Sequence, residues 1–307
     1  MTQKTIYIYS PSGAVRDKAA FRRGVRRLQA LGHQVEVDPN ALTSVQRFAG
    51  TDAQRVDAIR RAAASGADVA LITRGGYGLT RILADIPYRQ VARAIERGTQ
   101  FVGISDFTAF QMALFAKTGA VSWAGPALCE GFGADPAPDE IMEACFDDLL
   151  VGQGEGAGWR QPARGIVKDA PAWQARNATL WGGNLSMVVS LLGTPYFPEI
   201  RAGILFLEDV AEPPYRIERM LTQLLHAGVL GRQKALVLGQ FSESRVTPHD
   251  RGFNFEAVVA WLRAQLKIPV FTHLPYGHVP TKVLLPFGAK VDAVAEGRDV
   301  LLAWGHI

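Results

Sequence analysis

The stretch that decides the fold of this 307-residue chain is Phe101-Val102-Gly103-Ile104-Ser105-Asp106-Phe107-Thr108-Ala109-Phe110. Its first four residues are apolar or glycine and do not alternate with polar ones, which predicts a strand buried on both faces, as in a parallel sheet. Asp106 stands where a helix N-terminus prefers a carboxylate or a capping side chain. The stretch therefore predicts a strand, a tight turn and a helix, which together form a unit of an α/β fold.

Ser105 occupies the turn of this unit. In that position its hydroxyl would lie at the carboxyl edge of the sheet, beside the backbone N–H groups that begin the helix. An acyl-transfer enzyme needs this arrangement, because an exposed nucleophilic oxygen must stand next to donors for the oxyanion. A serine at the same place also serves as an ordinary helix cap. The turn alone leaves both roles open.

The composition is that of a globular protein, with 48% hydrophobic and 20% charged residues over 307 positions. This length is enough for two domains with sizeable cores. The net charge is +4, from 33 basic and 29 acidic residues. The basic residues are scattered, as in Arg22-Arg23 and Arg26-Arg27, and no aromatic residues stand between them, which favours a solvated helix face over a basic stripe for nucleic acid. We therefore expect no nucleic-acid partner.

The two cysteines, Cys129 and Cys145, form neither a disulfide framework nor the spacing of a zinc site, so we expect no metal. Residues 1–4 lead directly into a strand-like segment over 5–9 and lack the pattern of a signal peptide. No apolar run approaches the ~18 residues that a membrane helix needs. We expect a soluble, cytoplasmic protein without a membrane partner.

The first 151 residues predict a doubly wound α/β domain. Strands are expected over 5–9, 33–37, 69–72 and 121–123, in addition to the strand before Ser105, with helices between them. After the third of these strands, Arg74-Gly75-Gly76-Tyr77-Gly78 has three glycines in four positions. Such a segment indicates a backbone that adopts positive φ or lies against a ligand. A helix over 79–86 and a helix over 139–151 complete the domain.

A break in composition separates the second half, because residues 152–158 are rich in glycine. We place the domain boundary there, with domains over 1–151 and 164–307 and a linker over 152–163. In the second domain we expect strands over 164–167, 178–181, 203–207 and 235–238 and helices after Asn184, over 215–226 and over 255–266. Three short strands are expected near Val283, Val291 and Leu301. The pattern predicts a mixed α+β domain.

A serine nucleophile needs a base within hydrogen-bond reach and a group that orients this base. His278 follows a glycine on a loop, where a catalytic imidazole is commonly presented, and His273 in the same segment is the alternative. Glu208 closes an apolar run, and a carboxylate at the end of a buried strand is costly unless it is paired. Alternatively, Glu208 is a residue at the end of a strand whose side chain points into water. The order Ser, acid, His is that of α/β-hydrolases, but Phe107 stands where G-x-S-x-G has its second glycine.

Taken together, these residues resemble the LD-carboxypeptidases (muramoyltetrapeptide carboxypeptidases), a family of serine peptidases that also includes microcin self-immunity hydrolases. The resemblance covers essentially the whole chain and is greatest to the cytoplasmic murein-recycling branch. The matching motifs are, in chain order, Pro11-Ser12-Gly13, Phe48-Ala49-Gly50-Thr51-Asp52, Arg74 to Gly78, Gly103-Ile104-Ser105-Asp106-Phe107-Thr108, Gly125-Pro126, Trp181-Gly182-Gly183-Asn184-Leu185, Leu207-Glu208-Asp209, Arg219-Met220-Leu221 and Tyr276-Gly277-His278.

The resemblance implies a flavodoxin- or glutamine-amidotransferase-like N-terminal α/β domain and a C-terminal domain of swivelling β/β/α type, with the active site between them. It implies that Ser105 is the nucleophile and that Glu208 and His278 complete the triad, without a metal or organic cofactor. The implied substrate is a murein tetrapeptide, cut between the L-centre of its diamino acid and the terminal D-alanine during peptidoglycan recycling. The implied assembly is a homodimer.

The expected mechanism follows from these roles. His278 would take the Ser105 proton while Glu208 orients the imidazole. The backbone N–H of Asp106 and one from Gly75 or Gly76 would bind the oxyanion.

A carboxypeptidase must also bind a free carboxylate, which calls for a cation or N–H donors. Arg74 is our candidate, and its alternative is a salt-bridged loop arginine. Tyr77, Trp181 and Asn184 are further candidates for substrate binding.

Two other functions stay open. A self-immunity amidase that cleaves peptidyl- or aminoacyl-nucleotide toxins would need an aromatic platform for the base, for which Trp181 is available. A non-catalytic α/β ligand-binding protein would keep the fold without the chemistry, and the loss of Ser105 would then change no turnover.

Overall fold

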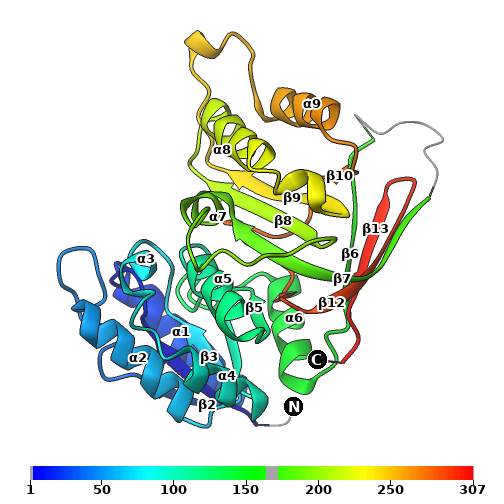
Figure 1. The fold of residues 1–307 in the computed structure, drawn as a ribbon. Helices are drawn as coiled ribbons and strands as arrows, with labels where there is room; N and C mark the ends of the chain where they lie inside the picture. The colour runs from blue at the N-terminus through cyan, green and yellow to red at the C-terminus, as the bar shows by residue number, and fades with distance from the viewer. Residues whose placement is uncertain (1–2, 164–171, 307) are drawn as a thin grey trace.

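The structure is a computed structural model that describes residues 3–163 and 172–306. Two sheets organise the described chain, one in each half of the molecule (Figure 1). The first sheet has the strand order β11-β5-β4-β3-β1-β2, and all of its neighbours are parallel except β11 and β5. Its strands are β1 (Thr5–Tyr9), β2 (Gln34–Val37), β3 (Val69–Ile72), β4 (Gln100–Gly103), β5 (Ser122–Ala124) and β11 (Leu285–Phe287).

Helices cover both faces of the first sheet. The faces are separated by the alternation of side chains along β1, because Ile6 and Ile8 pack in one apolar cluster and Tyr7 and Tyr9 in the other. The first cluster includes α1 (Lys18–Ala30) and α6 (Glu140–Val151), and the second includes α2 (Asp52–Ala64), α3 (Leu79–Ile82), α4 (Tyr88–Glu96) and α5 (Phe107–Thr118). The predicted doubly wound α/β domain is confirmed.

The second sheet has the strand order β10-β9-β8-β7-β12-β13-β6. The pairs from β10 to β7 are parallel, whereas β12, β13 and β6 pair antiparallel. Its strands are β6 (Gly156–Arg160), β7 (Trp173–Asn184), β8 (Ile204–Val210), β9 (Ala235–Ser242), β10 (Val270–Phe271), β12 (Lys290–Glu296) and β13 (Asp299–Ala303). Its helices are α7 (Leu185–Ser190), α8 (Pro214–His226), α9 (Phe255–Gln265) and the short 3-10 turns η1 (Leu230–Arg232) and η2 (Pro248–Asp250). The predicted mixed α+β architecture of this half is confirmed.

Several local expectations differ from the structure. The segment expected to be a linker contains β6, in which a Cβ on Gly156 would lie 2.7 Å from the backbone oxygen of Leu302, so this glycine allows a close contact between β6 and β13. The strand expected near Val283 is β11, and it joins the first sheet instead of the second. The helix expected over 79–86 ends at Ile82. The strand expected over 164–167 lies outside the described residues.

The two halves meet where α5 lies against β7 and α7 (Figure 1). A Cβ on Gly183 would lie 2.5 Å from Oγ1 of Thr108, so only a glycine allows this approach. One apolar cluster runs from the helices beside β1 through α5 into β7, β8 and β9. The beginning of α5, directly after Ser105, is therefore packed against the second sheet.

Candidate active site

Ser105 lies in a strained turn between β4 and α5. Its backbone φ is 69°, in the left-handed region that residues other than glycine rarely adopt. A Cβ on Gly103 would lie 2.6 Å from the ring of Phe107, so the glycine makes room for the helix to begin immediately. Although the second glycine of the hydrolase signature is absent, the backbone makes the same kind of sharp strand-to-helix turn that presents a nucleophilic hydroxyl.

The glycine-rich segment after β3 lies directly against Ser105. A Cβ on Gly75 would lie 2.5 Å from Cβ and 2.8 Å from Oγ of Ser105. Gly76 has a φ of 112° and Gly78 one of 145°, as the three glycines in four positions predict. Among the described residues, the N–H groups of Gly75, Gly76 and Asp106 donate no hydrogen bond to protein atoms. Two neighbouring backbone segments thus have free donors near one hydroxyl.

The sequence predicts that the side chain of Asp106 caps α5, but in the structure it forms no such hydrogen bond. Its carboxylate is buried and accepts hydrogen bonds from the Ser12 hydroxyl and, at 2.9 Å, from the N–H of Leu79. Burial raises the pKa of Asp106, and these hydrogen bonds oppose that rise. The reason for the difference is tertiary, because the side chain finds donors across the sheet edge, in the turn after β1 and at the first residue of α3. Asp106 therefore holds the glycine-rich segment in place.

Glu208 and His278 form a hydrogen-bonded pair. Nδ1 of His278 lies 2.7 Å from Oε2 of Glu208, and Glu208 is completely buried in β8. The second carboxylate oxygen of Glu208 accepts a 3.2 Å bond from Nδ2 of Asn184. A Cβ on Gly277 would lie 3.3 Å from Cβ of Glu208, so this glycine lets the histidine loop approach β8. The alternative of a strand-end glutamate in water is wrong.

The environment of His278 favours its protonated form. Burial lowers the pKa of His278, but the charge of Glu208 and the hydrogen bond to it outweigh burial, so the pKa is raised above its usual value. An imidazole that is held at Nδ1 by a carboxylate has Nε2 available for another group. The hydrogen bonds of the described residues include none between Ser105 and His278. His273, the alternative base, is exposed and forms no hydrogen bond with Glu208.

The other residues predicted to bind substrate include Arg74, Tyr77 and Asn184, and each has a different environment. Arg74 is largely buried, with Nε 3.9 Å from Oε1 of Glu130, and Tyr77 is 40% exposed beside Phe48. Asn184 accepts from the N–H of Met187 as the cap of α7, and its amide binds Glu208, so it positions the acid.

Trp181 does not line a substrate pocket. Its side chain has no exposed surface, its ring packs edge-on against Phe197, and its Nε1 donates to Gln233 at 3.1 Å. The prediction that Trp181 binds substrate or a nucleobase is therefore wrong for this structure. A tryptophan that follows an apolar strand pattern belongs to the core here.

Two charged residues that were not predicted from the sequence, Glu130 and Lys282, lie near the Glu208–His278 pair. Glu130 and Lys282 both act electrostatically on groups of the site, since the charge of Glu130 raises the pKa of His278 and the charge of Glu208 acts on Lys282. Lys282 is only four positions after His278, and this short spacing could have indicated from the sequence that it lies near the site.

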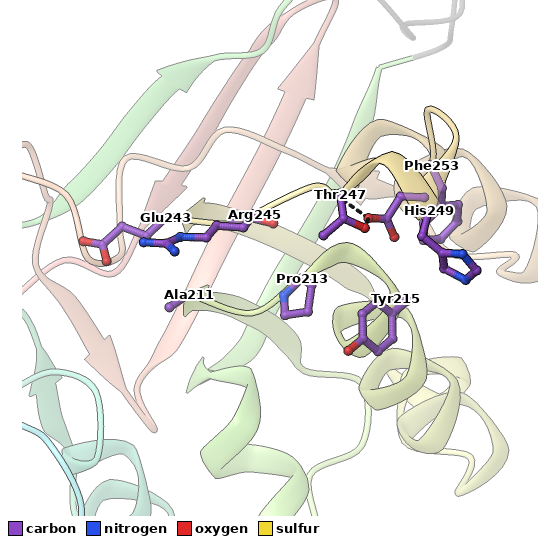
Figure 2. A pocket seen from close by; sticks show the side chains of 10 residues that line it. Ala211, Pro213, Tyr215, Glu243, Arg245, Thr247, His249 and Phe253 are labelled. Carbon is purple, nitrogen blue, oxygen red and sulfur yellow. Dashed lines mark hydrogen bonds between the residues drawn. The ribbon is translucent and has the colours of Figure 1, made fainter.

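A large cavity lies beyond the ends of β8 and β9, with a volume of about 1360 Å³. Figure 2 shows Ala211 and Tyr215 on the β8 side and the segment that follows β9 on the other. Ala211 comes three residues after Glu208, and the hydroxyl of Ser242 donates a 3.1 Å bond to the backbone oxygen of His278. The residues that line the cavity include neither Glu208 nor His278, so it lies beyond the ends of β8 and β9 rather than at the pair itself.

Among the described residues, no group of three or more His, Cys, Asp and Glu side chains is suited to a metal ion, and Cys129 and Cys145 are free. None of the described helices has the length and apolar character to cross a membrane.

Comparison with known proteins decides the family. The model of the LD-carboxypeptidase N-terminal domain matches residues 6–125, and that of the LD-carboxypeptidase C-terminal domain matches residues 177–292. The chain belongs to the LD-carboxypeptidase family. The crystal structure of muramoyltetrapeptide carboxypeptidase from Oxalobacter formigenes is 38% identical, with a TM-score of 0.87 over 98% of each chain.

Two curated relatives of this LD-carboxypeptidase carry different names. Murein tetrapeptide carboxypeptidase of Pseudomonas aeruginosa is 28% identical over 89% of this chain and 87% of its own. The microcin C7 self-immunity protein MccF of Escherichia coli is 26% identical over 96% of this chain and 92% of its own. The LD-carboxypeptidase family, a family of hydrolases, is thus established, and one relative is named for murein tetrapeptide and the other for microcin self-immunity.

Proposed function

We propose that this LD-carboxypeptidase hydrolyses the bond between the L-centre of the diamino acid and the terminal D-alanine of murein tetrapeptides, with Ser105, His278 and Glu208 as its triad. The observation that carries the proposal is the 2.7 Å bond between His278 and the fully buried Glu208. A buried carboxylate on Nδ1 orients an imidazole for proton transfer at Nε2. The names of the relatives from Oxalobacter formigenes and Pseudomonas aeruginosa support the substrate class.

In the proposed mechanism, Oγ of Ser105 attacks the scissile carbonyl carbon while His278 accepts the hydroxyl proton. The carbonyl oxygen becomes an oxyanion, which the N–H of Asp106 and that of Gly75 or Gly76 stabilise. His278 then gives its proton to the leaving nitrogen, and D-alanine departs. Water attacks the acyl-enzyme, again with His278 as base, which releases the tripeptide and restores Ser105.

The turn at Ser105 supports the role of nucleophile. A φ of 69° in a residue with a side chain costs about 1–3 kcal/mol, and such strain is retained mainly at functional sites. The N–H groups beside it, which have no acceptor within the described part of the chain, support the oxyanion site, because catalytic donors must be unpaired before substrate arrives.

The test is release of D-alanine from purified murein tetrapeptide. Ser105→Ala should lower kcat by at least about 1000-fold, as removal of a triad nucleophile does. Ser190→Ala, at an exposed serine of α7, is the matched control and should keep wild-type activity. Equal activity of wild type and Ser105→Ala would make Ser105 a helix-cap residue and refute the triad.

A self-immunity amidase is the second candidate, because MccF is similar over nearly the whole chain. The burial of Trp181 removes the platform that we expected for a nucleobase, which favours the tetrapeptide. Turnover of an aminoacyl nucleotide analogue, with none of the tetrapeptide, would reverse this choice. We further propose that the enzyme acts in the cytoplasm during peptidoglycan recycling and as a homodimer, on the basis of the family resemblance alone.

A further inference from the structure

Lys282 is a buried cation close to the candidate triad. Only 3% of the residue is exposed, although lysine is among the residue types that are rarely buried without a partner. Within the part of the chain that the structure describes, its ammonium group forms no hydrogen bond and no ion pair. A charge that is largely removed from water and has no protein partner is costly, so an anionic partner from outside would lower the free energy of this site.

The acidic residues near Lys282 are bonded to other groups. Glu208 is bonded to His278 and Asn184, and Glu130 lies 3.9 Å from Arg74. Asp139 caps α6 through one carboxylate oxygen, and its other oxygen accepts a 2.6 Å bond from the Thr281 hydroxyl. Because Arg74 is paired with Glu130, Lys282 is the cation of this group that has no partner within residues 3–163 and 172–306.

The chain places Lys282 on the same loop as His278. The N–H of Val283 donates a 2.8 Å bond to the carbonyl oxygen of Pro275 and closes a loop that contains both residues. Beyond this loop β11 pairs with β5, so the loop is anchored to the first sheet at one end and to β8 at the other, through Glu208. His278 would protonate the leaving nitrogen, and in a terminal amino acid the carboxylate is one carbon away from that nitrogen.

We propose that the ammonium group of Lys282 binds the terminal carboxylate of the substrate and so makes the enzyme a carboxypeptidase. The inference rests on the proposed function, since it assigns the leaving residue to the His278 side of the site. It replaces Arg74 as the cation that we expected for this carboxylate. A charge-assisted bond between the ammonium and a carboxylate in a buried site is stronger than a neutral one and discriminates against uncharged ends.

The electrostatics of the site agree with this role. Burial lowers the pKa of Lys282, while the charges of Glu130, Glu208 and Asp139 oppose that decrease. A carboxylate that enters the site adds a further negative charge and favours the protonated amine.

The experiment compares two substrates, the murein tetrapeptide with its free terminal carboxylate and the same peptide ending in D-alaninamide. Release of D-alanine or D-alaninamide is measured for wild type, Lys282→Met, Lys282→Arg and Arg74→Met. Wild type should prefer the free carboxylate. Lys282→Met should lose about 10- to 100-fold in kcat/KM on the acid and little on the amide, because only the acid uses the charge. Lys282→Arg should regain part of the preference.

Arg74→Met is the matched control and should keep the preference for the acid. Thermal unfolding of each variant separates a folding defect from a specificity change. The proposal is overturned if Lys282→Met prefers the acid as strongly as wild type, or if Arg74→Met loses the preference instead. If wild type cleaves neither peptide, the proposed function itself fails, and this inference fails with it.

Discussion

The backbone N–H of Asn184 donates a 3.0 Å hydrogen bond to Oγ1 of Thr108. Thr108 lies in the first turn of α5, three residues after Ser105, and the amide of Asn184 binds Glu208. One buried polar contact thus connects the helix that follows the candidate nucleophile with the strand that carries the candidate acid. The two halves of the site come from different sheets, and this contact is one of those that join them.

Thr108→Val should test that connection, because it keeps the shape of the side chain and removes its oxygen. The buried N–H of Asn184 would lose its acceptor, at a cost of about 1–3 kcal/mol in the free energy of unfolding. We expect kcat for D-alanine release to fall about 10-fold. Thr118→Val at the end of α5, whose hydroxyl binds the carbonyl of Leu114, is the control. An unchanged kcat despite lower stability would show that the contact holds the fold only.

The pH dependence should follow the surroundings of His278. Because a general base must be neutral and the pKa of His278 is raised, kcat/KM should fall as the pH decreases through a value above 6.5. Glu208→Gln removes the charge that raises this pKa and leaves the burial that lowers it. The acidic limb should then shift to lower pH while the maximal rate falls. A limb that stays in place in Glu208→Gln would contradict the assignment of Glu208 as the partner of the base.

The contact between Gly75 and Ser105 should make Gly75→Ala severely damaging. The new methyl group would lie 2.5 Å from Cβ of Ser105, so either the nucleophile or the donor segment must move. We expect kcat/KM to fall at least about 100-fold, since loss of one oxyanion donor alone has this effect. Gly158→Ala in β6, where the nearest atom would be 3.6 Å away, is the control. Wild-type activity in Gly75→Ala would remove this segment from the site.

Stability at acidic pH should depend on His33. This histidine is buried, and neither ring nitrogen has a hydrogen-bond partner among the described residues. Burial lowers the pKa of His33 in the folded protein, so the unfolded chain binds a proton more readily. The contribution of neutral His33 to the free energy of unfolding is therefore fully present above pH 6.5, the pKa of this histidine in the unfolded chain. It decreases as the pH falls from there toward the lower pKa in the folded protein.

The substitution that tests this dependence is His33→Leu, with denaturant unfolding measured at several pH values below and above 6.5. The variant should lose less stability on acidification than wild type. His249→Gln, at an exposed histidine, should behave as wild type. If His33→Leu and wild type have the same slope, another group dominates the acid response.

Local patterns in the sequence determined the units of the fold. Apolar runs without alternation indicated the buried parallel strands, and the glycines after β3 indicated the positive φ values found there. Glu208 at the end of an apolar run and His278 after a glycine were predicted as partners, and they are hydrogen-bonded. These features depend on the residues near them in the chain, which is why the sequence alone contains them.

Tertiary structure alone decided which side chains meet across the molecule. It buried Trp181 in the core, directed the carboxylate of Asp106 to Ser12 and Leu79 rather than to its own helix, and paired β11 with the first sheet. It also left Lys282 largely buried, with no hydrogen bond or ion pair to any of the residues that the structure describes. Each of these outcomes depends on groups that are far apart in the sequence and that compete for the same space and the same hydrogen bonds. Local sequence patterns therefore do not predict them.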